Sequence, residues 1–211
     1  MPASSRRPYA ARMPPLDRRR QLLDAALAVI IRDGYGAVSI ETIAREAEVS
    51  RPVIYGVFAG LGELLEALLD RQEQRALAQL SRVLPAVPAD EDPDRFLVGV
   101  ARSLAEAVAG DPDTWRPILL PPEGTPAAVR ERVDRDRERV RRQVEVLLEW
   151  SVARRGGPPG FDVELASHAL VAVAEHGGRL VLSDSERFSP SRLAGLVEVL
   201  LGASAPLSDG P

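Results

Sequence analysis

The feature that most constrains the fold of this chain is the stretch at residues 39–58, whose pattern is that of two short helices joined by a tight turn. In its first half the apolar side chains recur at separations of three and four residues, the period of one helical face: Ile40, Ile43, Ala44 and Ala47. Val49 falls in the predicted turn, and Ile54 and Phe58 lie four residues apart, facing the first helix. The small Ala44 lets the two helices cross closely. This spacing predicts a helix-turn-helix, in which the second helix enters the major groove of DNA.

The start of the second helix carries residues that are typical of a helix N-terminus. Ser50 is a preferred N-cap residue, and Pro52 is tolerated in a first turn because the N–H that proline lacks has no intrahelical partner there. A recognition helix meets the base edges with its N-terminal residues. The candidates for contact with DNA are therefore Ser50, Arg51, Pro52 and Val53.

The same stretch is similar to the tetracycline-repressor (TetR) family of bacterial regulators. The similarity is carried by Ile43, Ala44, Ala47, Val49, Ser50, Tyr55, Phe58 and Leu64, and by the preceding run Gly34-Tyr35-Gly36-Ala37-Val38-Ser39. It is specific over roughly residues 16–70 and rests on length and helical character beyond them. The resemblance implies an all-α fold, with an N-terminal three-helix DNA-binding domain and a helical ligand-binding and dimerisation domain.

The resemblance also implies that Arg51 and its neighbours supply base contacts and that Tyr55 donates its hydroxyl to a phosphate. We expect Arg51 to pair with guanine through two hydrogen bonds and Val53 to contact a thymine methyl group. Thr42, near the start of the preceding helix, is a candidate for phosphate binding. The alternative for Tyr55 is a place in the core, but the inward row that contains Ile54 already fills that space.

Two positions depart from the family pattern. Glu48 stands at the turn position that usually holds Gly, so a left-handed or strained conformation is expected there, at a cost of roughly 1–2 kcal/mol if fully left-handed. The Lys that usually follows the Phe and contacts phosphate is replaced within residues 58–62, Phe-Ala-Gly-Leu-Gly. One contact with the DNA backbone is therefore not provided at this position.

Charge is unevenly distributed along the chain. The formal net charge of −4 argues against a protein whose whole surface binds nucleic acid. Residues 1–60 hold nine Arg against six acidic residues, so a mildly basic N-terminal part precedes an acidic body, which favours DNA binding confined to one end. Residues 1–15 are rich in Pro, Ser and Arg and are predicted to be a disordered arm; the alternative is a basic arm that reaches DNA.

Helical periodicity, broken by Pro and Gly, predicts that the rest of the chain is also helical, and no strand pattern is convincing. Predicted helices cover residues 17–32, 61–83, 94–109, 125–154, 162–183 and 189–201, with an interrupted segment at 111–120 and loops at 86–93 and 156–160. Thr125 is predicted to cap the helix that begins there. The predicted domains are a disordered arm (1–15), a DNA-binding domain (16–60), a regulatory and dimerisation domain (61–203) and a disordered tail (204–211).

The body is expected to carry a ligand pocket and a dimer interface. The pocket candidates are Phe96, Arg102, Trp115, Arg116, Val140, Val144, Leu148 and Glu175. In the family the last two helices pair with a second copy, and the resemblance gives the interface candidates Leu165, Ala169, Ala172, Val173, Leu193, Leu196, Val197 and Leu200. The alternative for both sets is ordinary core packing. Gly177 and Gly178 permit close helix approach, and the mixed charges at 131–142 are interpreted as a solvated face rather than a second nucleic-acid site.

Composition excludes several other classes of protein. The chain has no Cys, so it has neither a disulfide framework nor a thiolate metal site. His168 and His176 lie eight residues apart, whereas metal binding on a helix prefers a spacing of four, so neither a metal site nor a cofactor is expected. No apolar run approaches the ~20 residues of a membrane span, and no signal-peptide pattern is found. The chain is expected to be cytoplasmic, without a membrane partner.

These observations predict a DNA-binding transcriptional regulator: a homodimeric repressor that binds a palindromic, double-stranded DNA operator and is released by a small-molecule effector. The alternative is a helical ligand-binding or scaffold protein of the same fold with weakened DNA binding, which Glu48 and the missing Lys favour. An enzyme is not predicted, because the sequence has no Gly-rich phosphate loop after a strand and no Ser in a nucleophile elbow.

Overall fold

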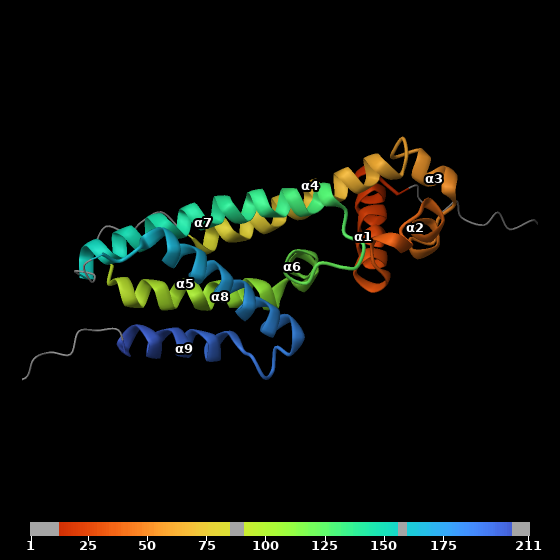
Figure 1. Ribbon diagram of the computed structural model, residues 1–211. Coiled ribbons are helices and arrows are strands. Elements are labelled where there is room, and N and C mark those ends of the chain that lie inside the picture. The colour runs from red at the N-terminus through yellow and green to blue at the C-terminus, as the bar shows by residue number, and fades with distance from the viewer. Residues whose placement is uncertain (1–12, 85–90, 156–159, 204–211) are drawn as a thin grey trace, which may run out of the picture. The chain divides into compact units, whose positions relative to one another are not determined.

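The computed structural model describes residues 13–84, 91–155 and 160–203, and all regular structure within these ranges is helical (Figure 1). The predicted all-α fold is therefore confirmed for the described part of the chain. Most of the predicted N-terminal arm and of the two predicted loops, and the whole predicted tail at 204–211, lie outside the described residues. The chain divides into two compact units, Met1–Leu68 and Leu69–Pro211. Within the described ranges, no helix is long and apolar enough to cross a membrane.

The first unit is built from α1 (Pro15–Asp33), the short 3₁₀ helix η1 (Tyr35–Ala37), α2 (Ile40–Glu46), α3 (Arg51–Tyr55) and the beginning of α4 (Leu61–Val83). α1 begins at Pro15, two residues before the predicted start, because proline fits the first positions of a helix, where no intrahelical N–H bond is lost. It ends at Gly34, whose φ of 80° is readily adopted by glycine.

One apolar core holds the first unit together. Buried side chains from α1, the helix-turn-helix and α4 meet in it, among them Leu22, Ile30, Ile43, Ile54, Phe58 and Leu64. Because Ile43 belongs to α2 and Ile54 to α3, their burial in one cluster joins the two helices as the spacing predicts. The guanidinium of Arg19 lies over the ring of Phe58, 4.5 Å from its centroid.

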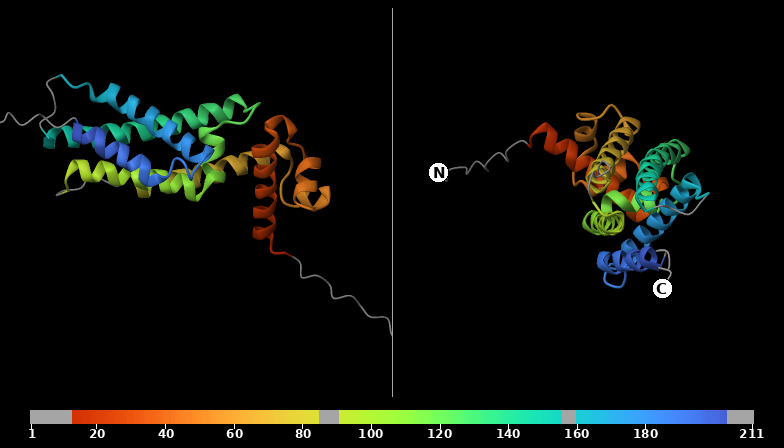
Figure 2. Two further views of the ribbon diagram at one scale, coloured as in Figure 1. Left: turned by 90° about the horizontal axis from the view of Figure 1, so that it is seen from below. Right: turned by 90° about the vertical axis from the view of Figure 1, so that its left-hand side faces the viewer.

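The second unit contains the rest of α4 and five further helices in the described ranges: α5 (Pro93–Gly110), α6 (Pro112–Leu119), α7 (Ala127–Arg155), α8 (Val163–Ser183) and α9 (Pro190–Ala203). α9 runs alongside α5, and α8 contacts α5, α6 and α7 (Figure 2). These contacts place α5 and α8 at the centre of the unit.

The predicted interruption at residues 111–120 is wrong, because α6 is continuous through Pro117. A proline has no N–H, so the carbonyl oxygen of Asp113, four residues earlier, loses its usual helical partner. Gln72 of α4 supplies another, since its Nε2 donates to this oxygen at 3.2 Å. Thr125 does not cap α7 as predicted either: its hydroxyl donates to the carbonyl oxygen of Pro122, and the helix begins two residues later.

Two smaller apolar clusters form the core of the second unit. One contains Ala76, Ala105, Val108, Trp115, Leu119, Val181 and Leu182, and the other contains Leu84, Phe96 and Leu147. Gly178 of α8 lies against the first cluster, where a Cβ atom would be 2.7 Å from Cδ1 of Leu119. This glycine therefore serves the close approach of α6 and α8 within one chain.

Charged side chains of α7 connect this helix to its neighbours, so the prediction of a solvated face at residues 131–142 is wrong in part. Arg132 pairs with Asp70 of α4 at 2.7 Å, and Arg137 pairs with Glu175 of α8 at 2.5 Å. The sequence pattern reports only neighbours on the same helix, whereas these partners are 62 and 38 residues away.

Candidate nucleic-acid interface

The predicted helix-turn-helix is present as α2, the turn at residues 47–50 and α3. α2 starts with a capping box, in which the backbone N–H of Thr42 donates to the Ser39 hydroxyl at 3.1 Å and the backbone N–H of Ser39 donates to the Thr42 hydroxyl at 2.8 Å. Thr42, a predicted phosphate contact, is half-buried and uses its hydroxyl to begin this helix.

The turn has the backbone conformation expected from the sequence. Glu48 has a φ of 54°, in the left-handed region that glycine adopts without strain. The N–H of Val49 bonds to the carbonyl oxygen of Ala44 at 2.9 Å. Gln21 of α1 adds a contact that residue spacing does not predict, because its Nε2 donates to the carbonyl oxygen of Ala47 at 2.9 Å. No local sequence pattern predicts this hydrogen bond, because the two residues are 26 positions apart.

α3 presents most of its predicted DNA-contacting residues to solvent. Ser50 is the N-cap residue of α3, as predicted, and has the extended backbone of that position, but its side chain makes no capping hydrogen bond. Its hydroxyl remains on the surface. Pro52 occupies the first turn as predicted. Arg51, Pro52 and Tyr55 are exposed and Val53 is half-buried.

Tyr55 is 56% exposed, whereas the adjacent Ile54 is completely buried. The alternative place for Tyr55 in the core is therefore excluded, and the helix has one face in the core and one in solvent. The exposed face offers a phenolic hydroxyl, a guanidinium and a serine hydroxyl, all of which are groups that donate hydrogen bonds to phosphates or base edges.

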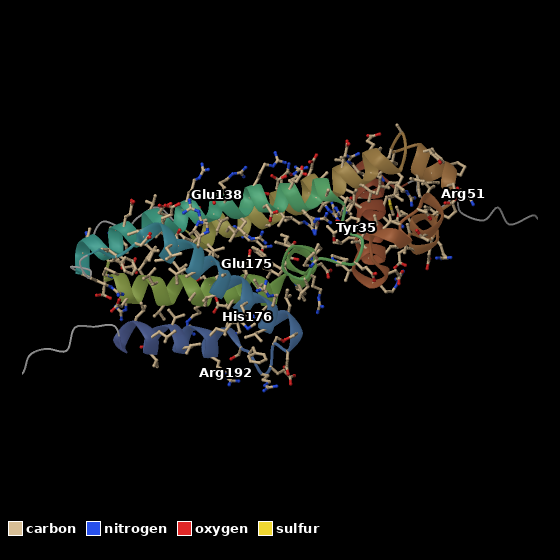
Figure 3. The ribbon with its side chains drawn as sticks, viewed as in Figure 1. Tyr35, Arg51, Glu138, Glu175, His176 and Arg192 are labelled. Carbon is tan, nitrogen blue, oxygen red and sulfur yellow. The ribbon has the colours of Figure 1, made fainter. Side chains whose placement is uncertain are left out.

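Arg51 forms an ion pair with α2. Its Nη1 lies 2.8 Å from Oε1 of Glu41, and both side chains are more than half exposed. Figure 3 labels the Arg51 side chain beside α3. Where the family's Lys is missing, the backbone N–H of Ala59 donates to the carboxylate of Glu63 at 2.6 Å, at the start of α4. This end of the unit thus contains acidic side chains beside the cationic one.

The eight pocket candidates do not converge on one cavity. Phe96 and Trp115 belong to different core clusters, and Arg102 is exposed. Val140 packs against the Phe96 cluster, Leu148 is buried and Val144 is half-buried. An apolar stripe predicts which side of a helix faces inward, but it does not predict which neighbouring helix that side meets.

The two remaining candidates line separate cavities of the second unit. Arg116 borders a cavity of about 370 Å³ where α5, α6 and the end of α8 meet, and its guanidinium donates to the carbonyl oxygen of Leu182 at 3.3 Å. Glu175 borders a cavity of about 180 Å³ between α7 and α8, together with Asp134, Arg137 and His168. The charged side chains that line this smaller cavity, such as Arg137 with Asp134 and Glu175, already form ion pairs with one another.

The charge network beside the smaller cavity is centred on the buried Arg141. Its Nε and Nη2 bond to Glu138 at 2.8 and 2.9 Å, and its Nη1 bonds to Glu145 at 2.7 Å and to the Ser167 hydroxyl at 2.8 Å. The hydrogen bonds from Arg141 and Arg142 lower the pKa of the Glu138 carboxyl to about 2. The same bond to Glu138 raises the pKa of Arg141.

None of the eight interface candidates is buried in the single chain. Leu193 and Val197 are half-buried and the other six are exposed, including Leu165 at 66% and Val173 at 64%. Leu193 packs against the cluster that contains Trp115, so the alternative of ordinary core packing holds for it, whereas the six exposed side chains lie outside the core of the single chain. Among the described residues, no group of three His, Asp or Glu side chains could hold a metal ion.

Comparison with known proteins adds to these observations. Residues 22–68 match the family model described as bacterial regulatory proteins, tetR family. A helix-turn-helix-type transcriptional regulator of Mycobacterium tuberculosis (strain H37Rv) is 26% identical over 194 residues, which cover 87% of this chain and 80% of that protein. The nicotine-responsive transcriptional repressor HdnoR of Paenarthrobacter nicotinovorans is 38% identical over 73 residues, or 35% of this chain and 38% of that protein.

The fold has a counterpart among solved structures. A TetR-like transcriptional regulator from Rhodococcus sp. RHA1 superposes with a TM-score of 0.72 and 25% sequence identity, covering 90% of this chain and 96% of that one. The match extends over both units, whereas the family model covers the helix-turn-helix and its flanking helices.

Proposed function

We propose that this chain, which belongs to the TetR family of bacterial DNA-binding regulators and is not an enzyme, acts as a homodimeric repressor of transcription. It binds a palindromic operator in the cytoplasm and is released by a small-molecule effector. The observation that carries the proposal is the helix-turn-helix at residues 40–55, whose second helix buries Ile54 in the core and exposes Arg51 and Tyr55.

The DNA contacts come from the exposed side of α3. Arg51 reads a base through its guanidinium, Val53 contacts a thymine methyl, and Tyr55 donates its hydroxyl to a phosphate. Ser50 and Pro52 lie beside the DNA backbone at the same helix end. Thr42 contacts phosphate only as far as its capping role leaves the hydroxyl accessible.

Dimerisation covers the apolar surface of α8 and α9. Leu165 and Val173 on α8 and Leu196 and Leu200 on α9 are all more than half exposed in the single chain, and a second copy would remove them from water. A two-fold dimer presents two copies of α3, which accounts for a palindromic operator with half-sites about one helical turn apart or a multiple of it.

The effector binds the second unit and favours a dimer whose two recognition helices are wrongly spaced for adjacent major grooves. The named response of HdnoR to nicotine supports a small molecule as the signal in a related repressor. A ligand can weaken DNA binding only as far as its affinities for the two states differ. Within the described part of this unit, Oε1 of Gln72 is a buried acceptor without a hydrogen-bond partner, and it supplies a polar group that an effector can pair with.

The second candidate, a ligand-binding or scaffold protein with weakened DNA binding, is favoured by two observations. Glu48 holds a backbone conformation that costs a non-glycine residue free energy, and the phosphate-contacting Lys is absent. Both would reduce affinity for DNA without changing the fold. Direct measurement of DNA binding separates the two candidates.

The test is selection of genomic fragments by the purified full chain, followed by anisotropy titrations of the best fragment at two salt concentrations. Enrichment of a palindrome, with affinity that falls as salt rises, supports the repressor. Tyr55→Phe keeps the ring and removes the hydroxyl, so it should weaken binding as much as Tyr55→Ala does. If no palindrome is enriched, the scaffold candidate takes precedence.

The dimer is tested by sedimentation of Leu196→Arg beside Val146→Arg. Val146, on α7, is 52% exposed and is not an interface candidate, so it is a matched surface position. The first variant should be monomeric and the second dimeric. Two dimeric variants would contradict the proposed interface.

A further inference from the structure

The ion pair between Arg51 and Glu41 lies on the exposed side of the helix-turn-helix and has no part in its core. Nη1 of Arg51 and Oε1 of Glu41 are 2.8 Å apart, and the side chains are 61% and 53% exposed. Glu41 stands in the first turn of α2 and Arg51 at the first position of α3, so the pair connects the two helices on their solvent side. A carboxylate beside a DNA-contacting Arg is repelled by phosphate, which calls for a physical reason for its presence.

We propose that Glu41 is a positioning residue that sets the base specificity of Arg51. The inference rests on the proposed function, because it requires that Arg51 reads a base. A free arginine side chain has many rotamers, and a guanidinium that can reach several bases discriminates poorly among them. Glu41 holds it in one place through Nη1.

The geometry leaves the guanidinium able to recognise guanine. The guanidinium of an arginine has five N–H groups. The N–H groups of Nε and Nη2 lie together on one edge of the plane, and Nη1 is not part of that edge. The contact with Glu41 involves Nη1, so the Nε–Nη2 edge can approach O6 and N7 of guanine. The carboxylate also disfavours a shift of Arg51 toward the phosphates, where its charge would bind every sequence equally.

Glu46 provides a matched control on the same helix. It also forms an exposed ion pair with an arginine, since its Oε2 lies 2.9 Å from Nη1 of Arg32. That arginine belongs to the end of α1 and is not a predicted DNA contact. Neutralising Glu46 removes the same charge from α2 without touching Arg51.

The experiment uses the full chain and the palindrome enriched from genomic fragments, with each base pair of one half-site substituted in turn. Anisotropy gives the affinity of wild type, Glu41→Gln, Glu46→Gln, Arg51→Ala and the double variant Glu41→Gln/Arg51→Ala for every sequence. Thermal denaturation followed by circular dichroism checks that each variant is folded.

Arg51→Ala should identify the base pair that Arg51 reads, as the position where discrimination is lost. Glu41→Gln should raise affinity for unrelated DNA and lower discrimination at that same position by at least about fivefold, the lower end of the value of one bidentate base contact. Glu46→Gln should leave discrimination unchanged. When Glu41→Gln is added to Arg51→Ala, the affinity for every DNA sequence should change by the same factor.

Three results would overturn the inference. Glu41→Gln could change affinity for all sequences equally, which would make it a general electrostatic effect. It could alter a position that Arg51→Ala leaves intact, which would make Glu41 an independent reader of a base. Arg51→Ala could leave every position unchanged, which would remove the residue to be positioned. Failure of the wild type to enrich any sequence is a different result, because it contradicts the proposed function itself.

Discussion

The two units of the chain are held together in different ways. In the first unit, side chains from α1, α2, α3 and α4 share one apolar cluster. All the buried polar or charged side chains among the described residues belong to the second unit. The second has two smaller apolar clusters, with Gln72, Thr114, Arg141 and Ser167 buried among its helices. An apolar core with one contiguous cluster specifies a rigid shape, which suits a unit that must match the DNA groove.

Polar contacts give the second unit a different response to change. A buried hydrogen bond can be replaced when a ligand or a neighbouring helix supplies an equivalent group. A cavity left by the deletion of an apolar side chain has no such replacement, so the lost packing lowers the free energy of unfolding. The first unit should therefore be most sensitive to lost volume, and the second to added volume and to pH. Point substitutions in each unit and a change of pH test this difference.

Phe58→Ala should lower the free energy of unfolding by about 3–5 kcal/mol, because the ring is 1% exposed and its removal leaves a cavity at the centre of the first unit. Urea denaturation followed by circular dichroism measures the loss. Tyr55→Ala is the matched control, since it deletes an aromatic ring from the exposed face of α3 and should change stability by less than about 0.5 kcal/mol. Equal losses in the two variants would contradict the assignment of faces.

Gly178→Ala should destabilise the second unit by up to about 2 kcal/mol. A Cβ atom at this position would be 2.7 Å from Cδ1 of Leu119, a buried side chain with little room to move. Overpacking costs about 1–3 kcal/mol, and the better helix propensity of Ala offsets about 1 kcal/mol of this. The measurement is the urea midpoint.

Gly177→Ala tests the same substitution one residue earlier. Its Cβ would lie 3.6 Å from Cδ1 of Leu193, an ordinary contact, so only the gain in helix propensity remains and stability should rise by up to about 1 kcal/mol. The two alanine variants should thus have opposite signs. Two stabilised variants would show that α6 and α8 can move apart at no cost.

The sequence predicts the first unit more fully than the second for the same physical reason. The periodic apolar residues of α2 and α3 have partners nearby in the chain, so Ile43, Ile54 and the left-handed Glu48 follow from spacing and residue type. The bond from Gln21 to Ala47 does not, because it spans 26 residues. In the second unit such distant contacts dominate, as in the pair of Arg132 with Asp70.

The predicted pocket fails for a related reason. A helical stripe predicts that Phe96 and Trp115 face inward, and both are buried. It does not predict that they enter separate clusters, which depends on how five helices cross. The interface candidates rest on the resemblance, in which the last two helices pair with a second copy, and their pairing stays a prediction that a single chain does not test.

Glu48→Gly should raise the free energy of unfolding by about 0.5–1 kcal/mol. Glycine removes the roughly 1–2 kcal/mol cost of a left-handed conformation for an L-residue, and the greater freedom of glycine in the unfolded chain offsets part of that gain. Glu46→Gly, at the last position of α2, is the control and should lower stability, because glycine adds freedom to the unfolded chain and the ion pair with Arg32 is lost. A destabilised Glu48→Gly would mean that this side chain makes a contribution larger than the backbone strain.

The smallest effect should appear in the pH dependence of the second unit. Hydrogen bonds from Arg141 and Arg142 lower the pKa of Glu138 to about 2, below the value of about 4.3 for an unfolded chain. The unfolded state therefore binds more protons between these values, so the contribution of Glu138 to stability is complete above about pH 4.3 and is lost as the pH falls toward 2. Glu138→Gln should remove this dependence, and the difference in urea midpoint between wild type and variant should shrink as the pH is lowered at constant ionic strength.

Glu131→Gln, on the same helix, separates this effect from a change in net charge. Arg135 bonds to the backbone oxygen of Glu131 at 3.4 Å, so neutralising the Glu131 carboxyl leaves that contact in place. Its urea midpoint, measured over the same pH range, is the reference for the loss of one negative charge from α7. If Glu138→Gln and Glu131→Gln change stability in the same way with pH, the bonds of Glu138 to Arg141 and Arg142 do not stabilise the folded state. The polar contacts of α7, including those of the buried Arg141, would then contribute little to the stability of the second unit.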